Sequence, residues 1–158
     1  MSPNSSGNYE PKMKRFVWRL QRVLDIKIKQ EQTKKTELLK LTEKLTLTRS
    51  ELLTQKRILE DIINNLSSKS PQNRLCEQEF FLRHSATSDE RIKKLKNKIS
   101  ELESAQKRKI AEVLSIRRFR KGLEKLRTEA KTQFIKEQEK LEQKELEDKA
   151  IIGFVRRR

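Results

Sequence analysis

The chain has 158 residues, of which 39% are charged and 33% are hydrophobic, and it contains only three Gly and three Pro. This composition excludes a compact domain built around a large apolar core. It favours long helices, which need few apolar residues per turn and few helix breakers. The formal net charge of +16 predicts attraction to polyanions, namely nucleic acid, anionic lipid or an acidic protein face, without choosing among them.

Residues 1–11 are rich in Ser, Asn, Pro and Gly, which predicts a disordered tail. They lack the apolar core of a secretory signal, and no apolar run in the chain is long enough to span a bilayer. A single cysteine, Cys76, excludes a disulfide framework and fits a reducing compartment. We therefore expect a cytoplasmic protein.

A first helix is predicted over residues 12–66, because apolar side chains recur there every seven residues. At about 3.5 residues per turn such side chains line one face of a left-handed coiled coil. Glu31 interrupts this line and, beside Lys27 and Lys34, predicts a polar layer that selects the register at some loss of stability. The line, here called the seam, consists of Val17, Leu24, Glu31, Leu38, Leu45, Leu52, Leu59 and Leu66.

The heptad pattern stops at residue 67, and residues 67–87 are predicted to be a connector. A Ser-rich stretch followed by Pro71 ends the first helix, since proline disfavours helical geometry at the residue before it. Thr87 and Glu90 have the spacing of a capping box, in which Thr87 caps the next helix and Glu90 reaches back to a backbone N–H.

A second helix is predicted over residues 88–152, followed by a basic tail at 153–158. Heptad lines run through it from Ile92 and from Leu95. Gly122 weakens the helix by roughly 1 kcal/mol relative to Ala, and we interpret it as a tolerated helix glycine rather than a hinge. A more apolar stripe predicts a register shift around 110–126. Its members are Ile110, Val113, Phe119, Leu123 and Leu126.

The predicted fold is all-α, a long two-helix antiparallel coiled-coil hairpin in which each helix covers the seam of the other. The connector is short compared with either helix, so this is the simplest arrangement. It needs no second chain, and we expect a monomer. A parallel homodimer of extended chains is the alternative.

Residues suited to catalysis are scarce. The three glycines are isolated, so no glycine-rich phosphate loop can form. One His (His84) and one Cys (Cys76) cannot supply the roughly four ligands of a zinc site, and neither has a convincing acid–base partner. We therefore predict no enzymatic activity, no catalytic residue, no metal and no cofactor.

Two segments combine aromatic and apolar side chains in a way that suits binding. Residues 15–24 interleave aromatics with arginine, as interface anchors often do, and their only tryptophan, Trp18, is placed near the outer face of the helix. Its alternative role is to close the end of the hairpin. Phe80 and Phe81 lie in the predicted connector, where they either pack against the hairpin end or attract a partner.

Two further segments are basic. Arg117, Arg118 and Arg120 form a run that wraps around the helix and suits either solvent, an acidic protein face or nucleic acid. The arginines at 156–158 follow four apolar residues and allow a weak peripheral membrane contact. Aromatic residues are not arrayed for base stacking, so no specific nucleic-acid partner is expected.

The opening block resembles the flagellar export protein FliJ family. Members begin with an aromatic, a spacer and an aromatic, followed by Arg-Leu-Gln, a spacer, Val-Leu, and then a Lys and a Glu. The stretch 142–150 is similar to the acidic, Gln-Lys-containing close of the family, so the resemblance covers nearly the whole chain. The long tail before Phe16 and the connector depart from the family pattern. The matching opening residues are Phe16, Trp18, Arg19, Leu20, Gln21, Val23, Leu24, Lys27 and Glu31.

The resemblance implies a stalk similar to the central subunit of rotary ATPases. Such a stalk would bind inside the hexameric flagellar export ATPase, contact the membrane export gate and handle export chaperones, at the cytoplasmic side of the membrane. A structural coiled-coil scaffold, a virulence type III secretion stalk and a basic nucleic-acid-binding protein are the alternatives. By similarity, the ring-binding candidates are Phe16, Trp18, Arg19, Leu20, Gln21, Val23, Leu24, Gln143 and Leu146.

Overall fold

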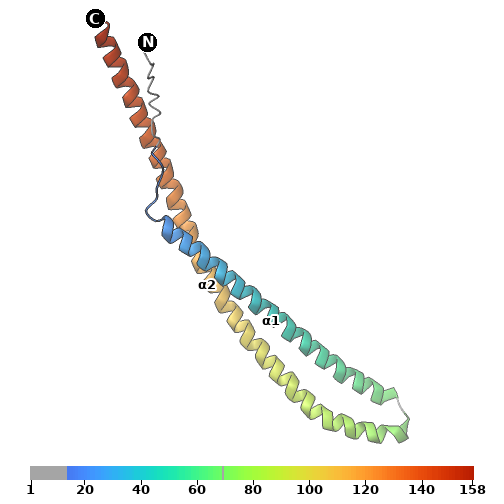
Figure 1. The fold of residues 1–158 in the computed structure, drawn as a ribbon. Helices are drawn as coiled ribbons and strands as arrows, with labels where there is room; N and C mark the ends of the chain where they lie inside the picture. Colours follow the sequence, from blue (N-terminus) through green and yellow to red (C-terminus); the bar gives the residue numbers. More distant parts are fainter. Residues whose placement is uncertain (1–13, 69) are drawn as a thin grey trace, which may run out of the picture. The chain divides into compact units, whose positions relative to one another are not determined.

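The computed structural model describes residues 14–68 and 70–158, and almost all of them are helical (Figure 1). Helix α1 is Gln21–Ser68 (48 residues) and helix α2 is Pro71–Arg156 (86 residues). No strand occurs in this part of the chain. The predicted all-α fold with two long helices is therefore confirmed, whereas the tail predicted at 1–11 lies outside the described residues.

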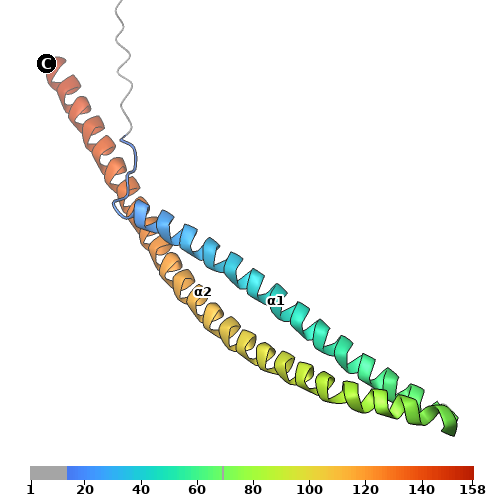
Figure 2. The same cartoon turned by 60° about the horizontal axis from the view of Figure 1, so that its bottom comes forward.

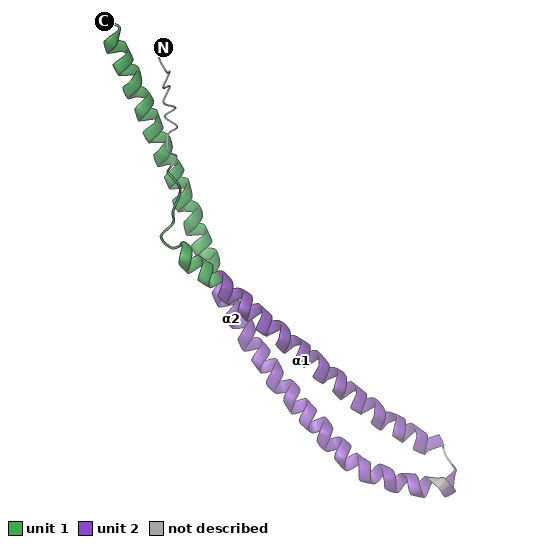
Figure 3. Cartoon of the chain, viewed as in Figure 1, with its two compact units in different colours: residues 1–27, 119–158 green, residues 28–118 purple. Residues whose placement is uncertain are grey.

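The chain divides into two compact units, which are described separately (Figure 3). Unit 1 is Met1–Lys27 with Phe119–Arg158, and unit 2 is Ile28–Arg118. Each unit contains a stretch of both helices, and the two stretches lie side by side in both views (Figures 1 and 2). The pairing of α1 with α2 is thus a property of each unit.

Contacts between the helices show that they run antiparallel. In unit 2, Glu31 pairs with Arg117, whereas Arg49, farther along α1, pairs with Glu103, nearer the start of α2. Unit 1 has the same direction, because Gln21 contacts Arg127, whereas Lys27, farther along α1, lies over Phe119, nearer the start of α2. One chain therefore covers its own seam, as expected for a helical hairpin, and the parallel homodimer is not needed to explain the seam.

The buried apolar side chains are few and come from the predicted heptad lines. Leu24 and Leu123 are buried in unit 1, and Leu45, Leu102 and Val113 are buried in unit 2. Such a narrow core is what a two-helix coiled coil can provide, because only one stripe of each helix faces the other.

The predicted register shift is wrong. Val113 and Leu123 are buried, whereas Ile110, Phe119 and Leu126 are 40%, 52% and 50% exposed. The heptad lines continue through this stretch because Val113 and Leu123 already face α1. Hydrophobicity alone had favoured the other stripe.

The first helix begins later than predicted, at Gln21 rather than at residue 12. The backbone N–H of Gln21 donates to the carbonyl of Trp18 in the turn that opens α1 (3.1 Å). Before this turn the Phe16 ring packs against the ring of Phe134 on α2, with 5.5 Å between the centroids. Val17 was predicted to be a seam residue, and this prediction is wrong, because its side chain is 83% exposed.

The predicted connector at 67–87 is largely helical. Helix α2 starts at Pro71, a position that suits proline because the first helical N–H needs no partner. Its first turn closes when the backbone N–H of Arg74 donates to the carbonyl of Ser70 (3.2 Å). Thr87 and Glu90 lie inside this helix, so the predicted capping box is wrong.

Helix α2 also runs past its predicted end at residue 152 and continues to Arg156. Every residue from 141 to 158 is exposed. Nearer the middle of α2, Phe134 contacts Phe16. Among the described residues of unit 1, the end of α2 from residue 141 therefore presents its side chains to solvent.

Candidate partner-binding site

Gln21 fastens the start of α1 to α2 in unit 1. Its side-chain Oε1 accepts a hydrogen bond from Nε of Arg127 at 2.7 Å, and its Nε2 donates to Oδ1 of Asp25 at 3.0 Å. Both halves of the amide are thus used, one between the helices and one along α1. A residue that the family resemblance assigns to binding therefore has a clear structural role.

The other members of the opening block divide into packed and exposed residues. Leu24 is buried, and Leu20 is half-buried. Phe16 and Trp18 are half-buried rather than placed on an outer face. Among the residues that match the family motif, Arg19 and Val23 are the two that present exposed side chains.

The closing block lies on the exposed end of α2. Leu146 is 67% exposed, and Gln143 donates from Nε2 to Oε1 of Glu147 one turn later (3.2 Å). This end carries a further apolar group that is exposed to solvent. Its members are Ile151 (62%), Ile152 (54%), Phe154 (67%) and Val155 (66%).

The two aromatics predicted in the connector lie on the first turns of α2 in unit 2. Phe80 is 54% exposed and its ring lies 4.1 Å from that of His84, while Phe81 is half-buried. Phe81 therefore continues the helix–helix interface. Phe80 remains available to a partner.

The three arginines of the basic run differ in their surroundings. In unit 2, Nε of Arg117 donates to the buried carboxylate of Glu31 (3.2 Å), and Arg118 is exposed. In unit 1, Nη1 of Arg120 donates to Oε1 of Glu124 at 2.7 Å. The run is thus not one patch, because two of its members are engaged in structural ion pairs.

Polar layers interrupt the interface of unit 2. Glu31 is 3% exposed and contacts Lys35 at 3.1 Å in addition to Arg117. A second polar layer lies farther along α1, at Thr42, whose Oγ1 accepts a hydrogen bond from Nε2 of Gln106 on α2 at 3.1 Å. Lys27, predicted in the Glu31 layer, places Nζ 4.9 Å from the centroid of the Phe119 ring in unit 1.

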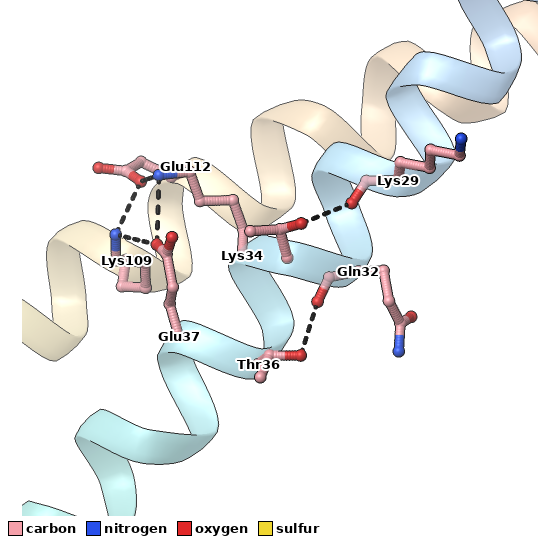
Figure 4. Close-up of polar contacts among 8 residues, drawn as sticks. Lys29, Gln32, Lys34, Thr36, Glu37, Lys109 and Glu112 are labelled. Atoms are coloured by element: carbon pink, nitrogen blue, oxygen red, sulfur yellow. Dashed lines mark hydrogen bonds and ion pairs between the residues drawn. The ribbon is translucent and has the colours of Figure 1, made fainter.

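The most connected polar layer joins Lys34 and Glu37 of α1 to Lys109 and Glu112 of α2 (Figure 4). Nζ of Lys109 donates to Oε2 of Glu37 at 2.8 Å and to Oε2 of Glu112 at 3.3 Å. Nζ of Lys34 contacts the same two carboxylates at 3.3 and 3.2 Å. Two acids and two bases therefore form a closed square across the helices.

The ion pairs of this square shift the pKa values of Glu37, Glu112 and Lys109. The hydrogen bond from Lys109, followed by that from Lys34, lowers the pKa of Glu37 below 4.5. The hydrogen bond from Lys34, followed by that from Lys109, lowers the pKa of Glu112 likewise. Glu37 and then Glu112 raise the pKa of Lys109 above 10.5.

We therefore expect acid to weaken the hairpin. The pKa values of Glu37 and Glu112 are lower in the folded state than in the unfolded chain. Their contribution to the stability of the hairpin is therefore complete above about pH 4.5, and it is lost as the pH falls through the lower pKa values of the folded state. The contribution of Lys109 to the stability of the hairpin is complete below its ordinary pKa of 10.5. It is lost as the pH rises through the higher pKa of the folded state. Thermal unfolding followed by circular dichroism from about pH 2 to pH 7 measures the acid limb.

The matched control for this experiment uses carboxylates outside the square. Replacing Glu37 and Glu112 together by Gln should make the midpoint of thermal unfolding depend less on pH below about pH 4.5. Replacing the exposed Glu43 and Glu101 by Gln should change this dependence less, because the structure records no ion pair for either residue. Equal weakening of this dependence by both pairs would contradict the assignment.

In the described residues, no helix is long and apolar enough to cross a membrane. Within the same residues, no group of three or more His, Cys, Asp or Glu side chains is placed to hold a metal ion.

Comparison with known proteins supports the resemblance seen in the opening and closing blocks. Searches of curated proteins and of solved structures found no significant match. A family model described as flagellar FliJ protein, in contrast, matches residues 15–158 and so includes both blocks and both helices. The chain therefore belongs to the FliJ family.

Proposed function

We propose that this FliJ-family chain is a non-enzymatic stalk of the flagellar protein export apparatus, binding the hexameric export ATPase through its terminal end. The observation that carries the proposal is the family match over residues 15–158. The ring-binding candidates of both terminal blocks belong to unit 1. The exposed stretch of α2 at residues 141–158 supports it, because its unburied apolar side chains are suited to a protein surface that would cover them.

The membrane export gate and the export chaperones are further proposed partners. Phe80 is the candidate contact at the opposite end of α2 from the ring-binding block, since it is exposed and aromatic. We place the protein in the cytoplasm, with peripheral attachment to the membrane through these partners.

ATP hydrolysis by the export ATPase of the same organism tests the proposal. The purified chain is added at about 0.15 M salt, where exposed charges are screened beyond roughly 8 Å. Polylysine serves as the control for the net charge of +16. Stimulation by the chain and not by polylysine supports a specific ring contact. No stimulation of an assembled, active ATPase would favour a generic coiled-coil scaffold instead.

Reversing the charge of Arg19 should weaken ring binding. Arg19 is exposed and belongs to the opening block, so Arg19→Glu leaves the helix interface intact while opposing any acidic surface of the ring. We expect binding to fall by roughly fivefold to tenfold, with a smaller effect at high salt. Titration of the ATPase by anisotropy or by stimulated hydrolysis measures the change.

Arg57→Glu is the matched control. Arg57 is also exposed, lies on α1 in unit 2, and makes no ion pair among the described residues. The two variants have the same net charge, so a loss of binding confined to Arg19→Glu identifies the terminal end. Unchanged binding by Arg19→Glu would remove this residue from the proposed contact.

A further inference from the structure

An exposed apolar patch spans both helices of unit 1. It consists of Val23 and Ile26 of α1 and of Phe119, Gly122 and Leu126 of α2, and we call it the lateral patch. The side chains of Val23, Ile26, Phe119 and Leu126 are 37%, 47%, 52% and 50% exposed. Gly122 is exposed as well. Groups of exposed apolar side chains of this kind mark interaction sites more often than isolated ones do.

Two contacts place the α1 and α2 members at the same level. Gln21 lies against Arg127, and Lys27 lies against Phe119, so residues 22–26 of α1 run alongside residues 120–126 of α2. The helices are antiparallel, and these two contacts bracket the patch at its ends. Its members are therefore neighbours across the interface.

The members also share one flank. Lys27 follows Val23 by four residues and so lies on the same face of α1. Its Nζ is 4.9 Å from the centroid of the Phe119 ring, which brings that face to the Phe119 side of α2. Gly122 and Leu126 follow Phe119 by three and seven residues and extend the same face of α2. The patch is continuous rather than spread around the hairpin.

Gly122 leaves the backbone of α2 without a side chain in this flank, and we call this position the notch. A Cβ atom built there would meet nothing within 4 Å, so the packing of the hairpin leaves room for alanine or a larger residue. Glycine is nonetheless one of the poorest helix formers. Its use is explained where another molecule must approach the backbone closely. The notch and the four apolar side chains are independent observations that point to one surface.

Basic side chains border the lateral patch. Arg19, Arg22 and Lys125 are exposed and lie within one helical turn of patch members, and none has an ion-pair partner among the residues that the structure describes. One acidic residue, Glu129, lies on the same face of α2, three residues after Leu126. An occupant with apolar side chains in the middle and acidic side chains at its edges would complement this surface.

We propose that the lateral patch binds an amphipathic α-helix with acidic flanks, presented by a partner protein. Such a helix would bury apolar side chains spaced three and four residues apart against Phe119 and Leu126, with its axis close to the Gly122 notch. This surface goes beyond the proposed ring contact and shares only Arg19 and Val23 with it.

The probe is a fluorescein-labelled synthetic helix with Leu at the heptad positions a and d and Glu at the flanking positions. Its anisotropy is followed as the full chain is added at about 0.15 M salt. We expect saturable binding that Leu126→Asp weakens by roughly tenfold or more. A scrambled peptide and a peptide with Lys in place of Glu should not bind. No binding of the acidic amphipathic peptide to the unaltered chain overturns the proposal.

Leu114→Asp is the matched control, because Leu114 is an exposed α2 leucine (42%) in unit 2, outside the patch. Equal weakening by Leu114→Asp and Leu126→Asp would mean that the peptide does not use the lateral patch. The ATPase assay is run on the same variants. Loss of peptide binding with intact stimulation separates this inference from the proposed ring contact, and so does the converse result.

The role of the notch is tested by Gly122→Gln, which should raise the stability of the helix and lower the affinity for the peptide. Gln favours the helix, so the midpoint of thermal unfolding should rise, while the longer side chain fills the notch and peptide affinity should fall by roughly tenfold. Thr128→Gln, at an exposed position of α2, should leave the affinity unchanged. A raised midpoint with unchanged affinity would show that the glycine has no role in binding.

Other occupants give other results. If the patch joins two copies of this chain, sedimentation will show a dimer that Leu126→Asp dissociates. If it binds a membrane, vesicles containing about 30% phosphatidylserine will displace the peptide from the unaltered chain. Either result overturns the assignment to an acidic helix.

Discussion

Replacing Leu45 by alanine is expected to lower the free energy of unfolding of the hairpin by about 2–4 kcal/mol. Leu45 is 2% exposed and has the most deeply buried large side chain in the described residues. The loss combines the transfer of buried methyl groups with the cavity that remains, since a helix pair can close only partly around it. Denaturant unfolding followed by circular dichroism measures the change.

Leu47→Ala is the control for this experiment. Leu47 lies two residues farther along α1 and is 71% exposed, so the same chemical change should cost no more than about 0.5 kcal/mol. A similar loss at both positions would mean that the hairpin does not pack with Leu45 inside. A small loss at both would mean that the two helices associate loosely in this region.

The sequence predicted several leucines of the interface between the helices, although Leu141, on the predicted line from Ile92, is 50% exposed. Leu24, Leu45 and Leu102 lie on the predicted heptad lines and are buried, because a seven-residue repeat can place apolar side chains continuously only against another helix. The antiparallel pairing followed from the short connection. The seven-residue repeat and the short connection were therefore sufficient to predict the fold class.

The ends of the helices were predicted less well, and the reasons are physical. Ser85 and Ser88 continue the half-buried face of α2 toward its start, but their polar side chains hid the pattern and suggested a connector. Residues 14–20 carry the apolar spacing of a helix. They lie outside α1, and Phe16 among them contacts Phe134, far away in the chain. A tertiary contact of that kind leaves no local signal.

The candidate binding residues could be named from the sequence, but their exposure could not. The opening motif contains Leu24, which is buried, and Gln21, which is used between the helices, beside Arg19 and Val23, which are exposed. The lateral patch was missed because Phe119 and Leu126 were assigned to the interface by a predicted register shift. Only the pairing across the helices shows that they face solvent.

The second large effect is expected at Glu31. The Glu31 side chain is 4% exposed and lies 3.1 Å from Nζ of Lys35 and 3.2 Å from Nε of Arg117. Glu31→Lys places a third cation at this buried position, and we expect it to destabilise the hairpin by about 3–5 kcal/mol. Glu31→Leu should be neutral or stabilising by up to a few kcal/mol, because the partner cations are partly exposed and can turn to water.

Glu31→Lys should destabilise the hairpin and Glu31→Leu should not, which raises the question of why Glu31 occupies the seam. If the hairpin slid by one heptad, residue 31 would face Glu124 or Ile110 instead of Arg117. The buried carboxylate would then lose the cation of the opposite helix, while Lys35 of its own helix would stay beside it. Glu31 therefore opposes the slipped pairings more than it stabilises the native one. Leucine at this position would accept several registers, as apolar seams do.

Disulfide trapping can read the register directly, with Cys76 replaced by Ser. Thr42→Cys with Gln106→Cys joins positions whose side chains are hydrogen-bonded at 3.1 Å, so this pair reports the native register. Thr42→Cys with Val113→Cys reports a slip of one heptad. We expect only the native pair to oxidise when residue 31 is Glu, and both pairs to oxidise when it is Leu. A Glu31→Leu chain that still forms only the native pair, although it is at least as stable, would show that leucine packing sets the register without the acid.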